Sequence, residues 1–487
     1  MAFFERTLCK FVPFSSQFTK KISSCSSGSL SNSEDIVLAA VSILKHHRSK
    51  SRWSNLRSLL DGKNCRLTAD QFSEIVLQLR NTPHLSLGFF NFTRNHSLCS
   101  HTLFSYSTVI HILSRSRLKS QAQALIKSSM IVFSEAHHQE SSTPVALFEA
   151  LIKTYRVCDS APFVFDLLVK ACIDAKKIDA AIEIYKMLRS KNLLLRTSTC
   201  NSLIELVSKG RGCFPMYDLY KDIFGLDDDV GGKGSNGKNV VPNAATFNVV
   251  MVGFYREGLL EKVVEVWQEM ESCGCVPNAY GYSMLMAVYS EDGNMEDAMK
   301  VRKEMENKCI KCDAVVYNTI IGGYCRIGEV GKAEEIYREM MTNGTESTCT
   351  TFEHLINGYC KTGDVDSAML LYKDMSRKGF IPENLTVNGI VRTLCDKDRV
   401  STAMTFLRVL GNKHGVVLED ENYVRLIRAT CQAGMMDEAL RLQAEMAVKG
   451  FEPDSEIYGA FIDGYMKIGN DRMACKLRNE MLGQQTS

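Results

Sequence analysis

The 487-residue chain carries 58 basic and 56 acidic side chains, so its formal net charge is only +2. This near-balance excludes phosphate binding driven by bulk charge, and a nucleic-acid role would need cations placed locally. Hydrophobic residues make up 45% and charged residues 23%, which is typical of a globular protein rather than a disordered one. No apolar run approaches the roughly 18 residues of a membrane helix, so no membrane partner is predicted.

The first 33 residues differ in composition from the rest of the chain. They hold nine serines, a single acid (Glu5) and four cations, of which only Arg6 is an arginine. Abundant serine, little acid and no apolar secretory core are typical of an organelle transit peptide. We therefore expect a transit peptide over 1–33, with mitochondrion as the favoured destination and chloroplast as the alternative. A disordered tail is the other interpretation of this segment.

Helical patterns without clear repetition cover 34–102, and degenerate helical repeats follow over 103–161. From residue 162 a period of about 35 residues becomes clear. In the 314–348 segment Tyr317, Ile320, Ile321 and Tyr324 share one helix face, and Gly328 separates them from a second apolar stripe. Each repeat is thus predicted to be two short antiparallel helices, which cannot be stable alone. The repeats are 162–196, 197–243 (with an insert at 225–240), 244–278, 279–313, 314–348, 349–383, 384–419, 420–454 and a truncated 455–481, before a tail at 482–487.

Equivalent positions agree across these repeats. From residue 244 onward the fourth place holds Phe or Tyr except for Val387, and the turn between the two helices holds glycine except for Asp398. From residue 279 onward the second helix carries an alanine at one recurring place. Self-similarity at a fixed period is the signature of a solenoid, in which each repeat buries its apolar face against the next. The predicted fold class is all-α, a right-handed α-solenoid of stacked helix-turn-helix repeats.

The 18 cysteines follow the same register. Cys325, Cys360, Cys395 and Cys431 are 35 or 36 residues apart, which predicts small, semi-buried apolar groups on equivalent helices. Cys309 and Cys312 form one CxxC pair, and a lone pair is a weak zinc signal. We predict no metal and no other cofactor.

The helix text VYNTIIGGYCRIGEVGKAEEIYREM and the turn endings VPN, IPE and EPD resemble the pentatricopeptide repeat family. The resemblance is specific over 162–481, and repeats of uniform length are similar to the P-type subclass of plant organelles. It implies sequence-specific binding of single-stranded organellar RNA, one base per repeat. In the family the fifth and last residues of a repeat face one base, the second residue packs on its ring, and the thirteenth lies near the RNA backbone. The implied base-recognition pairs are Asn201 with Asn243, Asn248 with Asn278, Ser283 with Asp313, and Asn318 with Thr348, followed by Asn388; the implied backbone contacts are Arg256, Arg326, Lys361 and Lys467.

The resemblance also implies a target. The asparagine pairs are similar to pyrimidine readers and Ser283 with Asp313 to a guanine reader, so the central RNA would be pyrimidine-pyrimidine-G-pyrimidine. After Thr348 the pattern departs from the family code, because Glu353 pairs with Glu383 and Asn388 with Glu419. For any polar fifth-place residue, local helix capping is the alternative interpretation.

No enzyme motif is complete in this sequence. A zinc deaminase needs H-x-E followed by P-C-x-x-C, but His138 and Glu140 lie far upstream of Cys309, which follows a lysine. The insert's Gly232-Lys233 lacks the other residues of a phosphate loop. We predict no catalysis and no small-molecule substrate. The expected action is occupancy of organellar RNA in transcript processing, stabilisation, splicing or translation, with RNA-processing proteins as further partners; a protein–protein scaffold is the alternative.

Overall fold

The computed structural model describes residues 31–46, 49–61, 66–137, 143–225, 240–414 and 418–484. Nearly all of the expected transit peptide, residues 226–239 of the insert, the His138–Glu140 segment and the last three residues lie outside this set. Regular structure in the described ranges is helical, apart from one isolated bridge between Leu67 and Cys99. The all-α fold class is therefore confirmed.

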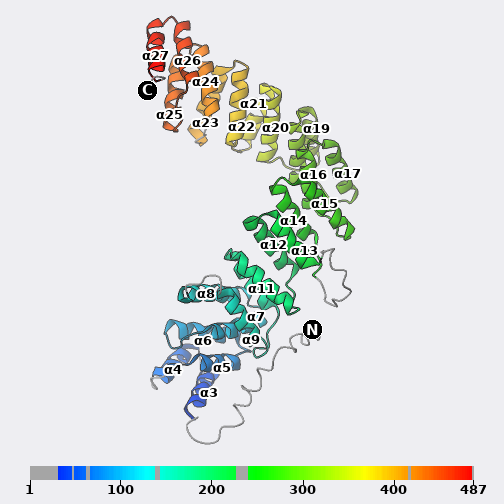
Figure 1. The fold of residues 1–487 in the computed structure, drawn as a ribbon, viewed down its shortest axis with the longest axis vertical. Coiled ribbons are helices and arrows are strands. Elements are labelled where there is room, and N and C mark those ends of the chain that lie inside the picture. Colours follow the sequence, from blue (N-terminus) through cyan, green and yellow to red (C-terminus); the bar gives the residue numbers. More distant parts are fainter. Residues whose placement is uncertain are drawn as a thin grey trace. The chain divides into compact units, whose positions relative to one another are not determined.

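The chain forms two compact bodies that divide between Lys262 and Val263, inside helix α15 (Leu260–Ser272). The N-terminal body begins with helices that precede the clear period (Figure 1). Its helices are α3 (Ser31–His46), α4 (Ser49–Asp61), α5 (Ala69–Gln78), α6 (Pro83–Asn95), α7 (Leu103–Arg115), α8 (Lys119–His137), α9 (Thr143–Thr154), α10 (Phe163–Asp174), α11 (Ile178–Ser190), α12 (Thr197–Arg211), α13 (Cys213–Phe224) and α14 (Ala244–Arg256).

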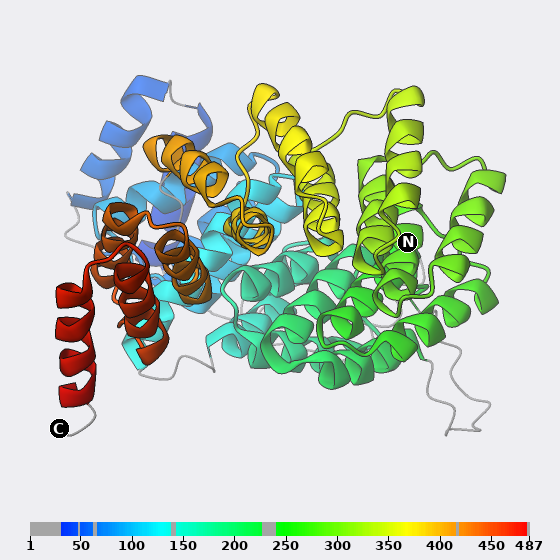
Figure 2. The same cartoon turned by 90° about the horizontal axis from the view of Figure 1, so that it is seen from above.

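The C-terminal body repeats one helical hairpin. Each first helix packs on its own second helix and on the first helix of the next repeat, so that the first helices form one layer. Figure 2 shows the last pair, α26 and α27, side by side. The helices are α16 (Ala279–Glu291), α17 (Met295–Asn307), α18 (Ala314–Arg326), α19 (Val330–Thr342), α20 (Cys349–Thr362), α21 (Val365–Arg377), α22 (Asn384–Asp396), α23 (Val400–His414), α24 (Asp420–Gln432), α25 (Met436–Val448), α26 (Ser455–Lys467) and α27 (Asp471–Gln484).

The turn between the two helices of a repeat needs a left-handed residue. Gly328 has φ 86°, a backbone conformation that glycine adopts without steric cost. Asp398 stands where the other repeats from 244 onward have glycine, and it adopts φ 55° all the same. The packing of the helices on either side thus imposes the turn even where the side chain opposes it.

The repeated apolar residues build the core. Tyr317 is 2% exposed, and Ile320, Ile321, Ala333 and Met340 are fully buried. The recurring thiols of Cys325, Cys360, Cys395 and Cys431 are buried too. Burial raises the pKa of Cys325 to about 12, so this thiol stays protonated and packs as an apolar group.

No helix among the described residues is long and apolar enough to cross a membrane. Within the same ranges, no group of three or more His, Cys, Asp or Glu side chains is arranged to hold a metal ion.

Candidate nucleic-acid interface

The last residue of a repeat is the N-cap of the next first helix. The side-chain oxygen of Asn278, Asp313 or Asp454 accepts the N–H three residues on, at 3.0, 3.0 and 2.9 Å. Asn243 and Thr348 do the same in full capping boxes. Asn, Asp and Thr are favoured caps because they satisfy an N–H that has no partner within the helix. The predicted base-reading residues at the last place therefore have a structural function as well.

The fifth-place residue lies beside this cap, and Asn318 shows the geometry most clearly. Its Nδ2 donates to Thr348 Oγ1 at 3.0 Å, and its Oδ1 accepts from Thr351 Oγ1 at 2.6 Å. An amide has two N–H donors and two acceptor lone pairs, so one of each remains available. Asn318 is half-buried, and its free edge can still donate and accept one hydrogen bond.

Asn201 repeats this arrangement in the N-terminal body. Its Nδ2 donates to Asn243 Oδ1 at 3.4 Å and its Oδ1 accepts from Thr246 Oγ1 at 2.8 Å. The structure thus brings together two of the predicted pairs, Asn201 with Asn243 and Asn318 with Thr348. In both pairs the spare donor and acceptor match the Watson–Crick edge of a pyrimidine.

Three other fifth-place residues accept hydrogen bonds at the junction with the next repeat through one side-chain oxygen each. Asp166 Oδ1 accepts from Arg196 N at 3.0 Å and from Thr199 Oγ1 at 2.8 Å. Glu353 Oε1 accepts from Glu383 N at 3.0 Å, and burial raises the pKa of this carboxyl.

Asn388, a predicted base reader, belongs to the same group. Its Oδ1 accepts from Glu419 N at 3.2 Å and from Asn422 Nδ2 at 2.9 Å, and the residue is 4% exposed. Both lone pairs of this oxygen are therefore occupied.

The remaining predicted pairs have a different environment. Ser283 is 6% exposed, and its hydroxyl donates to Ala279 O within the same helix at 2.9 Å. Asp313 is an exposed cap with no recorded bond to Ser283 in the described structure. Asn248 belongs to the N-terminal body and Asn278 to the C-terminal one.

The thirteenth-place cations lie at the ends of the first helices. Arg256, Arg326, Lys361 and Lys467 are all exposed. Arg326 Nη1 donates to Ser290 O at 3.0 Å, and Lys467 Nζ donates to Gln432 O at 2.7 Å. Each of these two bonds joins a cation to the C-terminal turn of the preceding first helix, where cations are favoured.

Sequence reasoning missed the third-place residue. The hydroxyl of Thr199, Thr246 or Thr351 donates to the fifth-place side chain of the preceding repeat. Asn422 contacts Asn388 in the same way. The recurrence of threonine at this place was the available signal, because a buried hydroxyl needs a partner.

Removing one of these hydroxyls tests its positioning role. Thr351→Val deletes the bond to Asn318 Oδ1 and the capping-box bond from Thr348 N, while keeping the side-chain shape. On the expectation from the family resemblance that Asn318 faces one base of a bound RNA, RNA affinity should fall several-fold, with the loss concentrated in discrimination at that base. Binding of RNAs varied at this position measures it.

Thr430→Val is the matched control, since the buried Thr430 hydroxyl bonds only to carbonyls of its own helix. It should lower stability slightly and leave base preference unchanged. Unaltered discrimination in Thr351→Val would show that the third-place hydroxyl has no part in recognition.

Sequence models of one family match the repeats. The PPR repeat family model matches residues 242–287, 313–361 and 348–396, and the pentatricopeptide repeat domain model matches 265–327. A further PPR repeat model matches 422–451 and 456–485.

Curated relatives come from Arabidopsis thaliana. One pentatricopeptide repeat-containing protein is 51% identical over 246 residues, which is 50% of this chain and 48% of the relative. Another, whose name includes "mitochondrial", is 28% identical over 234 residues, which is 48% of this chain and 39% of the relative. The chain thus spans about half the length, or less, of these relatives.

Solved structures give a weaker likeness. Maize PPR10 is 15% identical and has a TM-score of 0.40, covering 92% of this chain and 74% of its own. PPR10 in complex with an 18-nt psaJ RNA element is 16% identical, covers 93% and 79%, and has a TM-score of 0.39. The matches of the repeat models at intervals from 242 to 485, together with the 51% identical relative, show that the chain carries pentatricopeptide repeats.

Proposed function

We propose that the chain is a P-type protein that binds single-stranded organellar RNA in a sequence-specific manner and acts by occupancy rather than catalysis. The observation that carries this proposal is the pairing of Asn201 with Asn243 and of Asn318 with Thr348. Each pair is held by hydrogen bonds, and each fifth-place amide keeps one donor and one acceptor for a base. Recurrence of this arrangement on stacked repeats suits a linear ligand with one base per repeat.

The proposal extends to the rest of the chain. The array over 162–481 supplies the binding surface, and residues 1–33 act as a transit peptide. Several relatives have "mitochondrial" in their names, which supports a mitochondrial rather than a plastid destination. RNA-processing proteins are the further partners that an occupancy mechanism would recruit.

A protein–protein scaffold is the second candidate function. The carboxylates of Glu353 and Glu383, the fifth and last residues of the repeat 349–383, favour it for the C-terminal repeats because they repel a phosphate backbone.

Asp313→Asn tests base recognition without changing the size of the side chain. A carboxylate is acceptor-only and suits the two donors on the guanine edge, whereas an amide offers one donor and one acceptor. Asparagine caps a helix as well as aspartate does, so folding should be retained. We expect an approximately 10-fold or greater loss of preference for G at the third base of pyrimidine-pyrimidine-G-pyrimidine RNAs. Gel shifts with RNAs that differ at that base measure it.

The matched control is Asp454→Asn. Asp454 caps α26 as Asp313 caps α18, but its fifth-place partner is Val424, which offers a base no hydrogen bond. The control should bind RNA with unchanged preference. Absence of RNA binding by the unmodified chain would reject the proposed function. The protein–protein scaffold would then remain as the candidate function.

A further inference from the structure

The repeat 162–196 differs from the later repeats at its last place. From residue 197 to residue 454 this place holds Asn, Asp, Thr or Glu, whereas here it holds Arg196. Arg196 immediately precedes α12 and makes no side-chain bond to the start of that helix, because a guanidinium has donors only. The side chain of Arg196 is therefore not a helix cap, and its contacts lie elsewhere.

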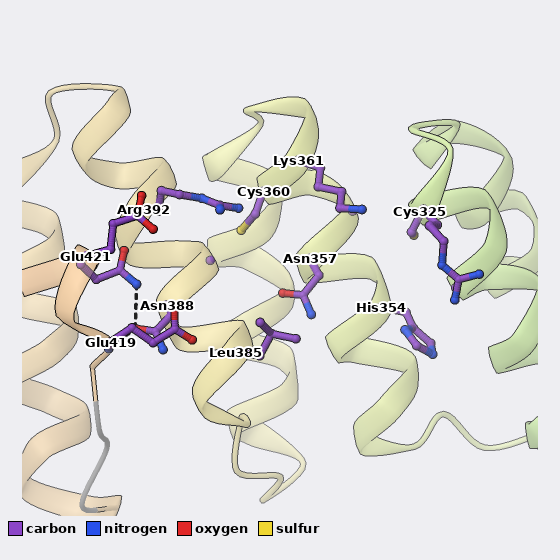
Figure 3. A pocket seen from close by; sticks show the side chains of 15 residues that line it. Cys325, His354, Asn357, Cys360, Lys361, Leu385, Asn388, Arg392, Glu419 and Glu421 are labelled. Atoms are coloured by element: carbon purple, nitrogen blue, oxygen red, sulfur yellow. Dashed lines mark hydrogen bonds between the residues drawn. The ribbon is translucent and has the colours of Figure 1, made fainter. Parts of the chain in front are cut away.

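Arg196 lies over the ring of Phe163, the second residue of the same repeat. Its Cζ is 4.3 Å from the ring centre, and Lys119 Nζ, at the start of α8, is 5.1 Å from the same centre. An aromatic face attracts cations, and a guanidinium stacks well on it. Phe163 is half-buried, whereas Leu385, at the second place of the repeat 384–419, is 66% exposed and lines an open hollow (Figure 3). The ring of Phe163 is thus engaged within the protein.

The carboxylate of Asp166, the fifth residue of this repeat, holds Arg196 from the protein side. Its Oδ2 is 3.8 Å from Arg196 Nε, and its Oδ1 accepts from Arg196 N at 3.0 Å and from Thr199 Oγ1 at 2.8 Å. Asp166 is 4% exposed, but the side chain of Arg196 is 58% exposed. The guanidinium is therefore fixed by buried partners while much of its surface remains open.

Hydrogen-bond reading of a base is closed in this repeat. Asp166 is buried and both lone pairs of its Oδ1 are occupied, so a base has no access to the fifth-place side chain. In the next repeat Asn201 is half-buried and keeps one donor and one acceptor. With one base per repeat, the nucleotide beside the one assigned to Asn201 would meet the guanidinium of Arg196 instead of a fifth-place amide.

We propose that the Arg196 guanidinium stacks on this neighbouring nucleobase without discriminating among the four bases. The inference rests on the proposed RNA binding, and it gives the repeat 162–196 a base contact that replaces the fifth-and-last pair. A guanidinium is planar, so one that lies over a ring can take a second ring on its outer face. Every base has a π face, which makes such a contact tolerant of sequence.

A nucleobase suits this site better than a phosphate does. The carboxylate of Asp166 offsets the charge of Arg196 and repels an anion, but it leaves the face of the guanidinium open. The site is thus a stacking platform next to the repeats that carry the proposed base-reading pairs.

The test compares a base with no base at the stacking place. RNAs carrying the preferred pyrimidine-pyrimidine-G-pyrimidine sequence are extended by one nucleotide at the 5′ end or at the 3′ end, with either a base or an abasic residue in the extension. For one of the two ends, we expect the base to tighten binding about 10-fold over the abasic residue. Adenine, guanine, cytosine and uracil in this extension should bind within about 3-fold of one another.

Arg196→Lys separates stacking from charge. Lysine keeps the positive charge but has no planar group, so the advantage of a base over the abasic residue should disappear. The dependence of affinity on salt should stay the same, because the number of charges is unchanged.

Arg189→Lys is the matched control. Arg189 lies on α11 in the same repeat, is exposed to a similar extent and also has an acidic partner, Asp222. It should retain the full advantage of a base over the abasic residue, and circular dichroism checks the folding of both variants.

Four results would overturn the stacking platform. Equal binding of base and abasic extensions by an unmodified chain that prefers the four-base sequence would show that this proposal is wrong while the proposed function stands. An unchanged advantage of the base in Arg196→Lys would show that the base stacks on another group. An approximately 10-fold preference for one base in the extension would show hydrogen-bond reading instead of stacking. Absence of any RNA binding would reject both proposals.

Discussion

Gly358→Leu is expected to destabilise the C-terminal body by about 3 kcal/mol. Gly358 lies in α20 where this helix packs on α18, and a Cβ there would lie 2.7 Å from Cys325 Sγ and 2.9 Å from Cys325 Cβ. Because Cys325 Cβ is fixed to its own helix, the added side chain can be accommodated only if the two first helices separate. Leucine is a strong helix former, so the loss cannot come from helix propensity.

Gly331→Leu is the matched control, because a Cβ on this helical glycine of α19 meets no atom within 4 Å. The same change there should stabilise the helix by about 0.5–1 kcal/mol. Chemical denaturation followed by circular dichroism measures both variants. Equal denaturation midpoints for the two variants would contradict the close approach of α18 and α20.

The tenth place is a packing feature that the sequence analysis overlooked. Gly253, Gly323, Gly358 and Gly464 all occupy it, and a Cβ on any of them would lie 2.5 to 2.8 Å from a side chain of the preceding repeat. The repeat alignment contained this signal. Periodicity shows which residues face inward, but the distance between two helices depends on the pair of side chains that meet there.

The helices were predictable because an apolar stripe and a turn residue recur with each period. Tyr317, Ile320 and Ile321 are buried as the stripe requires. Asp398 shows how far the register constrains the chain, since a non-glycine residue takes φ 55° there. The packing of the helices on both sides overrides the conformational preference of aspartate. The periodicity of the sequence reflects this packing, whereas the preference of a single residue does not.

The positions of the candidate site residues could be predicted from the sequence, but their hydrogen bonds could not. Register placed Asn318 beside Thr348, and the structure gives a 3.0 Å bond between them. Register could not show that Asn388 uses both lone pairs of its carbonyl within the protein, because that depends on the rotamers of Asn388 and Asn422. A fifth-place side chain can therefore hydrogen-bond to the next repeat, face a ligand, or do both.

This double use has a physical consequence for the array. A fifth-place side chain that bonds the next repeat's cap strengthens the interface between repeats, and stability in a solenoid is a sum of such interfaces. Asp166 and Asn388 are buried and bonded to the next repeat, whereas Asn201 and Asn318 are half-buried and keep capacity for a base. Interface strength and the proposed base recognition therefore compete at this place.

Lowering the pH from 7 to 4 is expected to remove about 3 kcal/mol of stability from the N-terminal body through the buried His111 alone. Burial lowers the pKa of His111 to about 4, whereas an unfolded histidine titrates near its ordinary value of about 6.5. The folded state therefore binds fewer protons than the unfolded state between these values. The stabilisation is complete above about pH 6.5 and is lost as the pH falls towards 4. His101, whose pKa burial and Arg94 also lower to about 4, acts in the same direction.

His111 connects three parts of this body, which makes its effect measurable locally. Its Nε2 donates to Leu151 O at 3.0 Å, since a carbonyl can only accept, and its Nδ1 then accepts from Ser160 Oγ at 2.6 Å. Protonation should therefore loosen α7 from α9 and from the turn before α10. Hydrogen exchange of the α7 and α9 amides at pH 7 and at pH 4.5 detects this opening.

His111→Gln can keep a donor towards Leu151 but has no proton to gain, so its stability should vary less with pH. The exposed His84 provides the control, because His84→Gln should retain the full pH dependence. If His111→Gln loses as much stability on acidification as the unmodified chain, the buried imidazole is not the origin of the acid sensitivity. If protection of α7 instead rises as the pH falls, the sign of the argument is wrong, because a group that is neutral when folded can only favour unfolding when it takes up a proton.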